Sequence, residues 1–278
     1  MLLQDLAQPA LKRLFILRAS LGVARLCNAP DKLLKCLGAA LRKTLHGSLS
    51  PNESASIQRI EDLRNRLCSS SEPLVKTDYG AGSKSATGVN TTVGETCKAS
   101  SKPYFWSLLL FNLIRELKPS SCVELGTCLG ISASFQATAL KFNGGGHLIT
   151  LEGAESLALL ARDHFSELAL DNVSVVTGRF QDTLDGVLRN ERTVDYAFID
   201  GHHDEQATLR YFRQILQFLA PTALLVFDDI SWSPGMRRAW TNIIADRRVK
   251  VSIDLRIMGI CVFSPDPGEP RHMRIPLL

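Results

Sequence analysis

The sequence lacks a long apolar run and a strong excess of either charge. No stretch approaches the roughly 18 apolar residues that a membrane-spanning helix requires, so we expect no transmembrane helix. The formal net charge of the 278 residues is only +4, and aromatic residues make up 7%. Hydrophobic residues at 45% and charged residues at 22% are ordinary values for a globular protein, which excludes the disordered and collagen-like classes.

Cysteine is present, but not in the pattern that a metal or disulfide framework requires. The seven cysteines are odd in number and scattered, and no two of them form a CxxC pair. This pattern supports neither a structural zinc site nor a set of disulfides. We therefore expect free thiols and a reducing, cytoplasmic location.

Basic residues gather near the beginning of the sequence. Residues 1–50 hold eight Lys and Arg against two Asp, a net charge of +6, so the remaining residues carry −2. Because the larger part of the chain is not basic, we expect no nucleic-acid partner.

Residues 1–68 are predicted to form a helical N-terminal extension. Leu34, Leu37 and Leu41 recur at helical spacing on one face, with Lys and Arg elsewhere. Two interpretations are open. The helices either cap the main domain or a second subunit, which would make a homodimer, or they make peripheral contact with an anionic membrane.

Residues 69–103 are rich in Ser, Thr, Gly and Lys and contain the stretch DYGAGS at 78–83. A long polar segment within a compact chain is either disordered or functional. We predict a flap or linker that orders over a ligand.

Residues 104–278 alternate apolar strands with amphipathic helices. Seven strands are expected, at 122–126, 147–152, 173–178, 194–200, 223–229, 249–255 and 259–264. This alternation predicts an α/β fold with a doubly wound, mostly parallel seven-stranded sheet covered on both faces. No helix separates the last two strands, so they should form an antiparallel hairpin at one edge.

Ligands of such a fold bind outside the carboxyl ends of the strands, so the residues that follow each strand are the informative ones. They form this set: Glu124, Gly126, Thr127 and Gly130 after the first strand, Glu152 after the second, Phe180 and Gln181 after the third, Asp200, His202 and His203 after the fourth, and Asp228 and Asp229 after the fifth.

The first of these loops reads E-x-G-x-x-x-G, which differs from the G-x-G-x-x-G of dinucleotide-binding enzymes. Gly126 permits a tight turn, and Gly130 permits close approach of a ligand to the start of the next helix. Glu152 can accept hydrogen bonds from both hydroxyls of a ribose. Together these features favour an adenosine-containing ligand without a diphosphate, although a plain strand–helix turn and a solvated acid would also explain them.

Four motifs in order resemble the class I S-adenosylmethionine-dependent methyltransferases: VELGTCLGIS, LITLEG, FIDGHH and VFDDISWS. They are similar in particular to the O-methyltransferase branch typified by catechol-type and macrolide-sugar enzymes. The resemblance covers roughly residues 57–275. It is specific for the fold and the cofactor, and much less so for the substrate.

The resemblance implies S-adenosyl-L-methionine as the cofactor and a hydroxyl of a small molecule, a natural product or a sugar, as the methyl acceptor. Glu124, Gly126 and Gly130 would line the methionine part of the cofactor, and Thr127 and Ser132 would offer it hydroxyls.

The rest of the cofactor would meet residues after the second and third strands. Glu152 would bind the ribose, and Phe180 and Gln181 would border the adenine.

The resemblance also places a divalent cation, Mg²⁺ or another, on Asp200, Asp228 and Asp229, and a catalytic base at His203. Catechol-type enzymes carry Asn where Asp229 stands, which is a departure from the pattern. A hard cation suits carboxylates and can lower the pKa of a bound hydroxyl, and an imidazole can then take the proton.

Other interpretations of these residues are open. The three aspartates could cap helices or bind the cofactor's amino group, and His202 could be the base. Trp232, Trp240 and Tyr79 are candidates for a substrate wall. At the level of the whole chain, the alternatives are a non-catalytic interaction module that uses the basic helices, or an N-methyltransferase that needs no metal.

Overall fold

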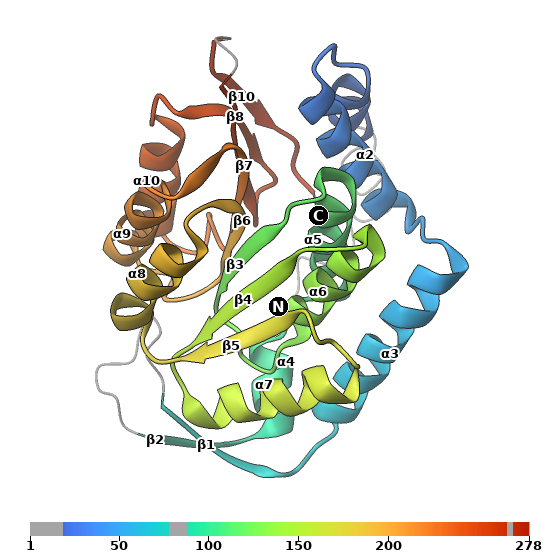
Figure 1. The fold of residues 1–278 in the computed structure, drawn as a ribbon, viewed down its shortest axis with the longest axis vertical. Helices are drawn as coiled ribbons and strands as arrows, with labels where there is room; N and C mark the ends of the chain where they lie inside the picture. The colour runs from blue at the N-terminus through green and yellow to red at the C-terminus, as the bar shows by residue number, and fades with distance from the viewer. Residues whose placement is uncertain (1–18, 78–87, 266–268, 278) are drawn as a thin grey trace, which may run out of the picture.

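An eight-stranded sheet with helices on both faces forms the centre of the computed structural model (Figure 1). The structure describes residues 19–77, 88–265 and 269–277. The strand order is β10-β8-β9-β7-β6-β3-β4-β5, and β9 is antiparallel to both of its neighbours, whereas the other pairs are parallel. The doubly wound α/β class predicted from the sequence is therefore confirmed.

Seven strands of the large sheet correspond to predicted ones: β3 (Ser121–Leu125), β4 (His147–Glu152), β5 (Val173–Thr177), β6 (Val194–Ile199), β7 (Leu219–Phe227), β8 (Val249–Asp254) and β9 (Gly259–Phe263). β7 begins four residues before its predicted start, and the eighth strand, β10 (Arg271–Arg274), was not predicted.

Buried side chains alternate between the two faces of the sheet, as the period of two in a strand requires. In β3, Cys122 packs into the core on one face, while Val123 and Leu125 pack into the core on the other. Both faces are apolar because helices cover both, and this is why the strands appear in the sequence as nearly continuous apolar runs.

The helices form two layers. On one face lie α8 (Phe180–Glu191), α9 (Glu205–Ile215) and α10 (Pro234–Ile244). The other face carries α5 (Tyr104–Leu117), α6 (Ile131–Asn143) and α7 (Glu155–Glu167), and outside them α2 (Lys32–His46), α3 (Pro51–Cys68) and α4 (Val93–Ser100) (Figure 1).

The N-terminal helices pack on the main body of the chain. Leu34, Leu37 and Leu41 of α2 are buried in the core that α2 shares with α5, and the Asn112 side-chain amide donates a 3.0 Å hydrogen bond to Thr44 across this contact. The apolar face of α2 thus meets protein, as the cap interpretation expects. Membrane contact and dimer formation stay predictions, and the part of the extension before residue 19 lies outside the described residues.

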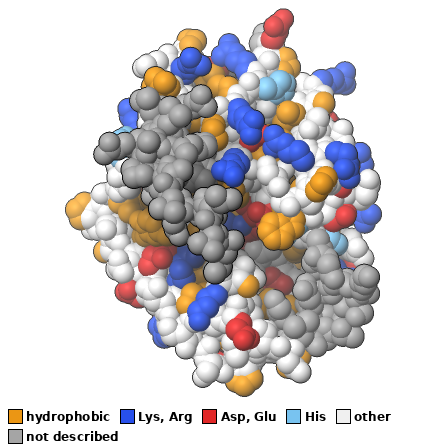
Figure 2. Space-filling view, turned by 180° about the vertical axis from the view of Figure 1, so that it is seen from behind, with side chains coloured by type: hydrophobic (Ala, Val, Ile, Leu, Met, Phe, Trp, Pro, Cys, Tyr) orange, Lys and Arg blue, Asp and Glu red, His pale blue; other side chains and the backbone are white. Residues whose placement is uncertain are grey.

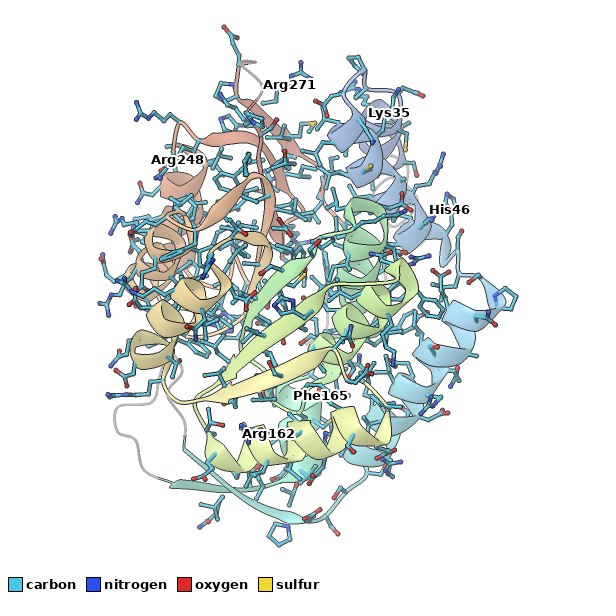
Figure 3. All side chains as sticks on the ribbon, viewed as in Figure 1. Lys35, His46, Arg162, Phe165, Arg248 and Arg271 are labelled. Carbon is cyan, nitrogen blue, oxygen red and sulfur yellow. The ribbon has the colours of Figure 1, made fainter. Side chains whose placement is uncertain are left out.

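Basic side chains from both ends of the described chain gather at one end of the molecule. Lys35 projects from α2 and Arg271 from the start of β10 at this end (Figure 3). Figure 2 shows Lys and Arg side chains over the upper part of the opposite view. None of the helices among the described residues is long and apolar enough to span a bilayer.

Two predictions about the sheet need correction. The strand β10 was missed because its sequence, RHMR, is charged and largely exposed, so it carries no apolar signal. As a result the sheet has eight strands instead of seven, and the β8–β9 hairpin lies one strand in from the edge, where β10 pairs in parallel with β8.

The polar segment 69–103 contains regular structure. β1 (Pro73–Thr77) and β2 (Gly88–Thr92) form an antiparallel pair, and α4 follows with a capping box of Thr92 and Glu95. The stretch 78–83, on which the prediction of a flap centred, lies outside the described residues.

Candidate active site

The carboxyl ends of four neighbouring parallel strands meet at one edge of the sheet. Leu125 of β3 is paired with Leu151 of β4 and with Ile199 of β6, and Ile199 is paired with Phe227 of β7. The residues that follow these positions are therefore brought side by side. The structure thus places Gly126, Glu152, Asp200 and Asp228 at one edge, as the sequence analysis expects.

The turn after β3 is fixed by a backbone contact. Gly126 has a φ of +107°, and a Cβ built on it would lie 2.0 Å from the carbonyl oxygen of Asp200. The backbone N–H groups of Gly126 and Thr127 donate to the carbonyl of Leu151. Only glycine fits at this point, because a side chain would collide with the neighbouring strand end.

Gly130, which directly precedes α6, has a φ of +80°, and Phe165 of α7 packs 2.8 Å from where its Cβ would be. The glycine therefore lets α7 approach the start of α6 closely.

Backbone strain is concentrated at this edge. Of the eight non-glycine residues with positive φ in the described chain, four lie here: Cys128, His202, His203 and Asp229. Such conformations are uncommon for residues with a side chain and often mark functional sites, where the surrounding structure enforces them.

Glu152 is held in position by backbone donors. One carboxylate oxygen accepts a 2.7 Å hydrogen bond from the N–H of Cys128, and the other accepts a 2.9 Å hydrogen bond from the N–H of Ala154. Each oxygen of a carboxylate can accept more than one hydrogen bond, so this geometry is compatible with the predicted ribose contact.

Glu124 lies beneath the edge and is fully buried. Its carboxylate accepts hydrogen bonds from the hydroxyls of Ser132 (2.7 Å) and Thr150 (2.6 Å) and from the side-chain amide of Gln136 (2.7 Å). Thr127 bonds to Thr150 in the same network, at 2.7 Å. Glu124, Thr127 and Ser132, predicted to face the cofactor, are thus joined to one another, and their contact with a ligand stays a prediction.

Burial raises the pKa of Glu124 from 4.5 to about 7, despite these three hydrogen bonds. The Glu124 carboxyl group therefore keeps its proton up to about pH 7 in the folded chain, whereas it loses the proton near pH 4.5 in the unfolded chain. Folding stability should fall by about 3 kcal/mol as the pH rises through that window. In Glu124→Gln this fall should be missing, as urea unfolding at pH 5 and pH 8 will measure. A wild-type pH dependence that persists in Glu124→Gln, as it should in the exposed control Glu155→Gln, would contradict the assignment.

Lys102 joins the acidic residues at the strand ends. Its ammonium lies 3.2 Å from Asp200 Oδ2 and also donates a hydrogen bond to Asp228 Oδ2. All three side chains are nearly or fully removed from solvent. Burial lowers the pKa of Lys102, but the charges of Asp200 and Asp228 outweigh it and raise the pKa above its usual range, so the side chain is an ammonium. Burial and the charge of Asp228 raise the pKa of Asp200.

Lys102 is a site residue that the sequence analysis does not identify. It precedes α5, and its backbone carbonyl accepts hydrogen bonds from the Arg64 guanidinium of α3 and from the Ser107 hydroxyl of α5. Arg64 is itself paired with Glu61 at 3.0 Å. The helical extension therefore helps to position a residue of the site.

His203 faces the acidic residues and His202 does not. The Nε2 of His203 lies 3.7 Å from Asp200 Oδ1, and its Nδ1 lies 3.7 Å from Asp229 Oδ2. Burial lowers the pKa of His203 from 6.5, which leaves the imidazole neutral and able to accept a proton near neutral pH. His202 Nδ1 lies 3.1 Å from the Tyr211 hydroxyl instead.

One group of side chains among the described residues has the composition of a cation site. Asp200, His203 and Asp228 each bring one ligand atom, and these atoms lie within 4.8 Å of one another. Asp229, predicted as the third ligand, is not in this group, and His203 stands in its place. The group already surrounds the Lys102 ammonium through its two aspartates.

The remaining candidates are spread around this edge. Phe180 packs edge-on against Tyr211, with ring centroids 5.8 Å apart, and lies over Gly201, while Gln181 is exposed. Trp240 is buried over Gly259, whereas Trp232 is 71% exposed. Tyr79 lies outside the described residues.

Comparison with known proteins gives the following likenesses. The family described as a methyltransferase domain matches residues 123–230, a span that contains every residue predicted to bind the cofactor, hold a metal or act as the base. An O-methyltransferase from Bacillus cereus, solved in complex with SAH, is similar at 21% identity with a TM-score of 0.54, over 76% of this chain and 90% of that one.

Two further solved structures are similar over 59% of this chain. TomG, an O-methyltransferase from Streptomyces achromogenes involved in tomaymycin synthesis and solved with SAM, shows 21% identity, a TM-score of 0.51 and coverage of 82% of its chain. SAH-bound PaMTH1, a methyltransferase from Podospora anserina, shows 16% identity, a TM-score of 0.52 and coverage of 80%. At these identities the likeness concerns the fold.

Proposed function

We propose that this chain is a methyltransferase that transfers a methyl group from S-adenosylmethionine to a hydroxyl of a small molecule. One observation carries the proposal. Glu152 and the 126–130 turn, which suit the cofactor, lie at the same sheet edge as His203 beside Asp200, which suits a hydroxyl acceptor.

The residues that would hold the cofactor come from the ends of β3, β4 and β5. Gly126, Thr127 and Gly130 form the turn, with Glu124 and Ser132 beneath it, and Glu152 would take the ribose hydroxyls. Phe180 and Gln181 begin α8, where the adenine is expected. In known proteins of this fold SAM and SAH are bound, which supports the assignment.

The chemistry asks for a base beside the acceptor oxygen. Bound S-adenosylmethionine supplies a methyl group on a positively charged sulfur. The acceptor oxygen forms a bond to that methyl carbon, the carbon–sulfur bond breaks, and its electron pair goes to sulfur. His203 takes the hydroxyl proton, and Asp200 and Asp229 on either side of the ring favour the imidazolium that results.

The divalent cation that the family resemblance implies does not fit beside Lys102. Asp200, His203 and Asp228 offer suitable ligand atoms, but the ammonium already lies against both aspartates. A divalent cation about 4 Å from an ammonium would be repelled by about 8 kcal/mol at an effective dielectric constant of about 20. We therefore derive no step through a metal. A metal-assisted reaction remains a prediction that requires Lys102 to leave this position.

The exposed Trp232, three residues after Asp229, supports an acceptor with a flat apolar surface. A cytoplasmic location, a homodimer and peripheral membrane contact stay predictions. The acceptor itself is proposed only as a class, a hydroxylated small molecule.

Isothermal calorimetry with S-adenosylmethionine tests the foundation of the proposal. We expect micromolar binding in Mg²⁺ and in EDTA alike. Glu152→Gln should weaken binding by about 10- to 100-fold, because a charged hydrogen-bond acceptor contributes about 1.5–3 kcal/mol. The matched control is Glu155→Gln, an exposed acid at the start of α7.

Equal affinity in Glu152→Gln and wild type would remove Glu152 from the cofactor site. No binding by wild type would favour the non-catalytic interaction module. Once binding is established, transfer of a labelled methyl group to hydroxylated compounds and to amines separates an O-methyltransferase from an N-methyltransferase.

A further inference from the structure

We propose that the Lys102 ammonium is the cation of this active site, held between Asp200 and Asp228 where related chemistry would use a divalent metal. This inference rests on the proposed function for its catalytic meaning. Its structural content, that one side chain of the protein occupies a cation position, can be tested without cofactor or acceptor.

The contacts of Lys102 leave it able to meet a ligand. An ammonium has three N–H donors. Within the described part of the chain, its acidic partners are Asp228 and Asp200, so one donor is left for an oxygen of the acceptor. The side chain is 12% exposed, so a ligand can reach the ammonium although most of the side chain is buried.

Asp228 supplies an independent sign that a ligand belongs here. Its side chain is fully buried, and while Oδ2 accepts from Lys102, Oδ1 has no hydrogen-bond partner among the described residues. A buried carboxylate oxygen without a donor is costly, so such an atom next to a cluster of charged groups indicates a donor supplied by a ligand.

The position of Lys102 is built by the surrounding structure. Its carbonyl is bonded by both Arg64 and Ser107, which come from different helices, and Pro103 follows it and begins the approach to α5. Backbone anchoring from two sides limits how far the ammonium can move. The contacts with Asp200 and Asp228 then hold the ammonium itself within the cluster.

The ammonium would do two things in the proposed reaction. It balances the charge of two carboxylates that would otherwise repel an ionising hydroxyl. Its remaining N–H can donate to the acceptor oxygen while His203 removes the proton from that oxygen. Both effects are those expected of a cation at this point, and neither needs a metal.

The test is a titration of the full-length protein with MnCl₂, in which electron paramagnetic resonance measures free Mn²⁺. Wild type should bind no stoichiometric Mn²⁺. Lys102→Met should bind one Mn²⁺ per chain, with an affinity about tenfold or more above any that wild type shows. The reason is that Asp200, His203 and Asp228 lose their counter-charge. Lys102→Arg, which keeps a cation, should bind none. Lys141→Met, which removes an exposed lysine paired with Asp171, is the matched control and should behave as wild type.

One tightly bound Mn²⁺ in wild type that Asp228→Asn abolishes would overturn the inference, and so would a folded Lys102→Met that binds no Mn²⁺. Should Lys102→Met fail to fold, as thermal unfolding will reveal, the wild-type titration decides, together with turnover in EDTA. Turnover that needs added Mg²⁺ refutes the inference, and turnover unchanged in EDTA supports it. Calorimetry with S-adenosylmethionine tests the proposed function separately, so the proposed function and this inference can fail independently.

Discussion

Replacing His203 with Asn should lower turnover by about 100- to 10,000-fold, the usual contribution of a general base. His203 lies 3.7 Å from carboxylate oxygens of both Asp200 and Asp229, and no other imidazole among the described residues faces these groups. Asparagine tolerates the positive φ of this position, so the loss should reflect chemistry more than folding. Initial rates of methyl transfer and the affinity for S-adenosylmethionine should be measured on the same preparation, and the affinity should change little.

His202→Asn is the matched control for this prediction. It also has a positive φ, but its ring meets the hydroxyl of Tyr211, so its removal should reduce turnover far less. A greater loss in His202→Asn than in His203→Asn would reverse the assignment of the base.

The pH profile gives a second reading of His203. Burial holds its pKa below 6.5, and only the neutral ring can take a proton. The rate should therefore fall as the pH drops through that lowered pKa and stay level from there to neutral pH. This acid limb should be absent from the residual activity of His203→Asn.

The largest effect on stability is expected from Gly126→Ala. The added methyl group would lie 2.0 Å from the carbonyl oxygen of Asp200, which belongs to the backbone and cannot turn away. The φ of +107° adds strain for any residue with a Cβ. We expect a loss of about 4 kcal/mol or more in the free energy of unfolding, measured by urea denaturation.

Gly144→Ala controls for the cost of a positive φ alone. Gly144 ends α6 with a φ of +80°, and nothing lies within 4 Å of where its Cβ would be. Its replacement should cost only about 1–2 kcal/mol. Similar losses of unfolding free energy in Gly126→Ala and Gly144→Ala would mean that the backbone at Asp200 can shift to accommodate the added methyl group.

The fold was predictable from the sequence where strands are buried on both faces. β3 and β6 appear as short apolar runs, and their bounds were predicted to within a residue of those observed. β10 could not be found in this way, since it pairs at the edge through its backbone and has a basic, largely exposed sequence, RHMR. β1, β2 and α4 were missed because they are short and lie within a segment rich in Ser, Thr, Gly and Lys.

The candidate site was predictable where position along a strand determines position in space. Asp200 and Asp228 follow neighbouring strands, so pattern alone brings them together. Lys102 precedes a helix and is 126 residues from Asp228, and no periodicity connects the two. A lone lysine before Pro103, between a polar segment and an apolar helix, gives no signal from which its role could be read.

Because Arg64 of α3 donates a hydrogen bond to the carbonyl of Lys102, we expect activity to require that α3 is packed in place. A molecule in which α3 has not yet reached the α/β body would hold Asp200 and Asp228 with a poorly anchored counter-charge. Such a molecule can have a complete sheet and still be inactive. Specific activity should then report only those molecules in which Arg64 of α3 contacts the carbonyl of Lys102.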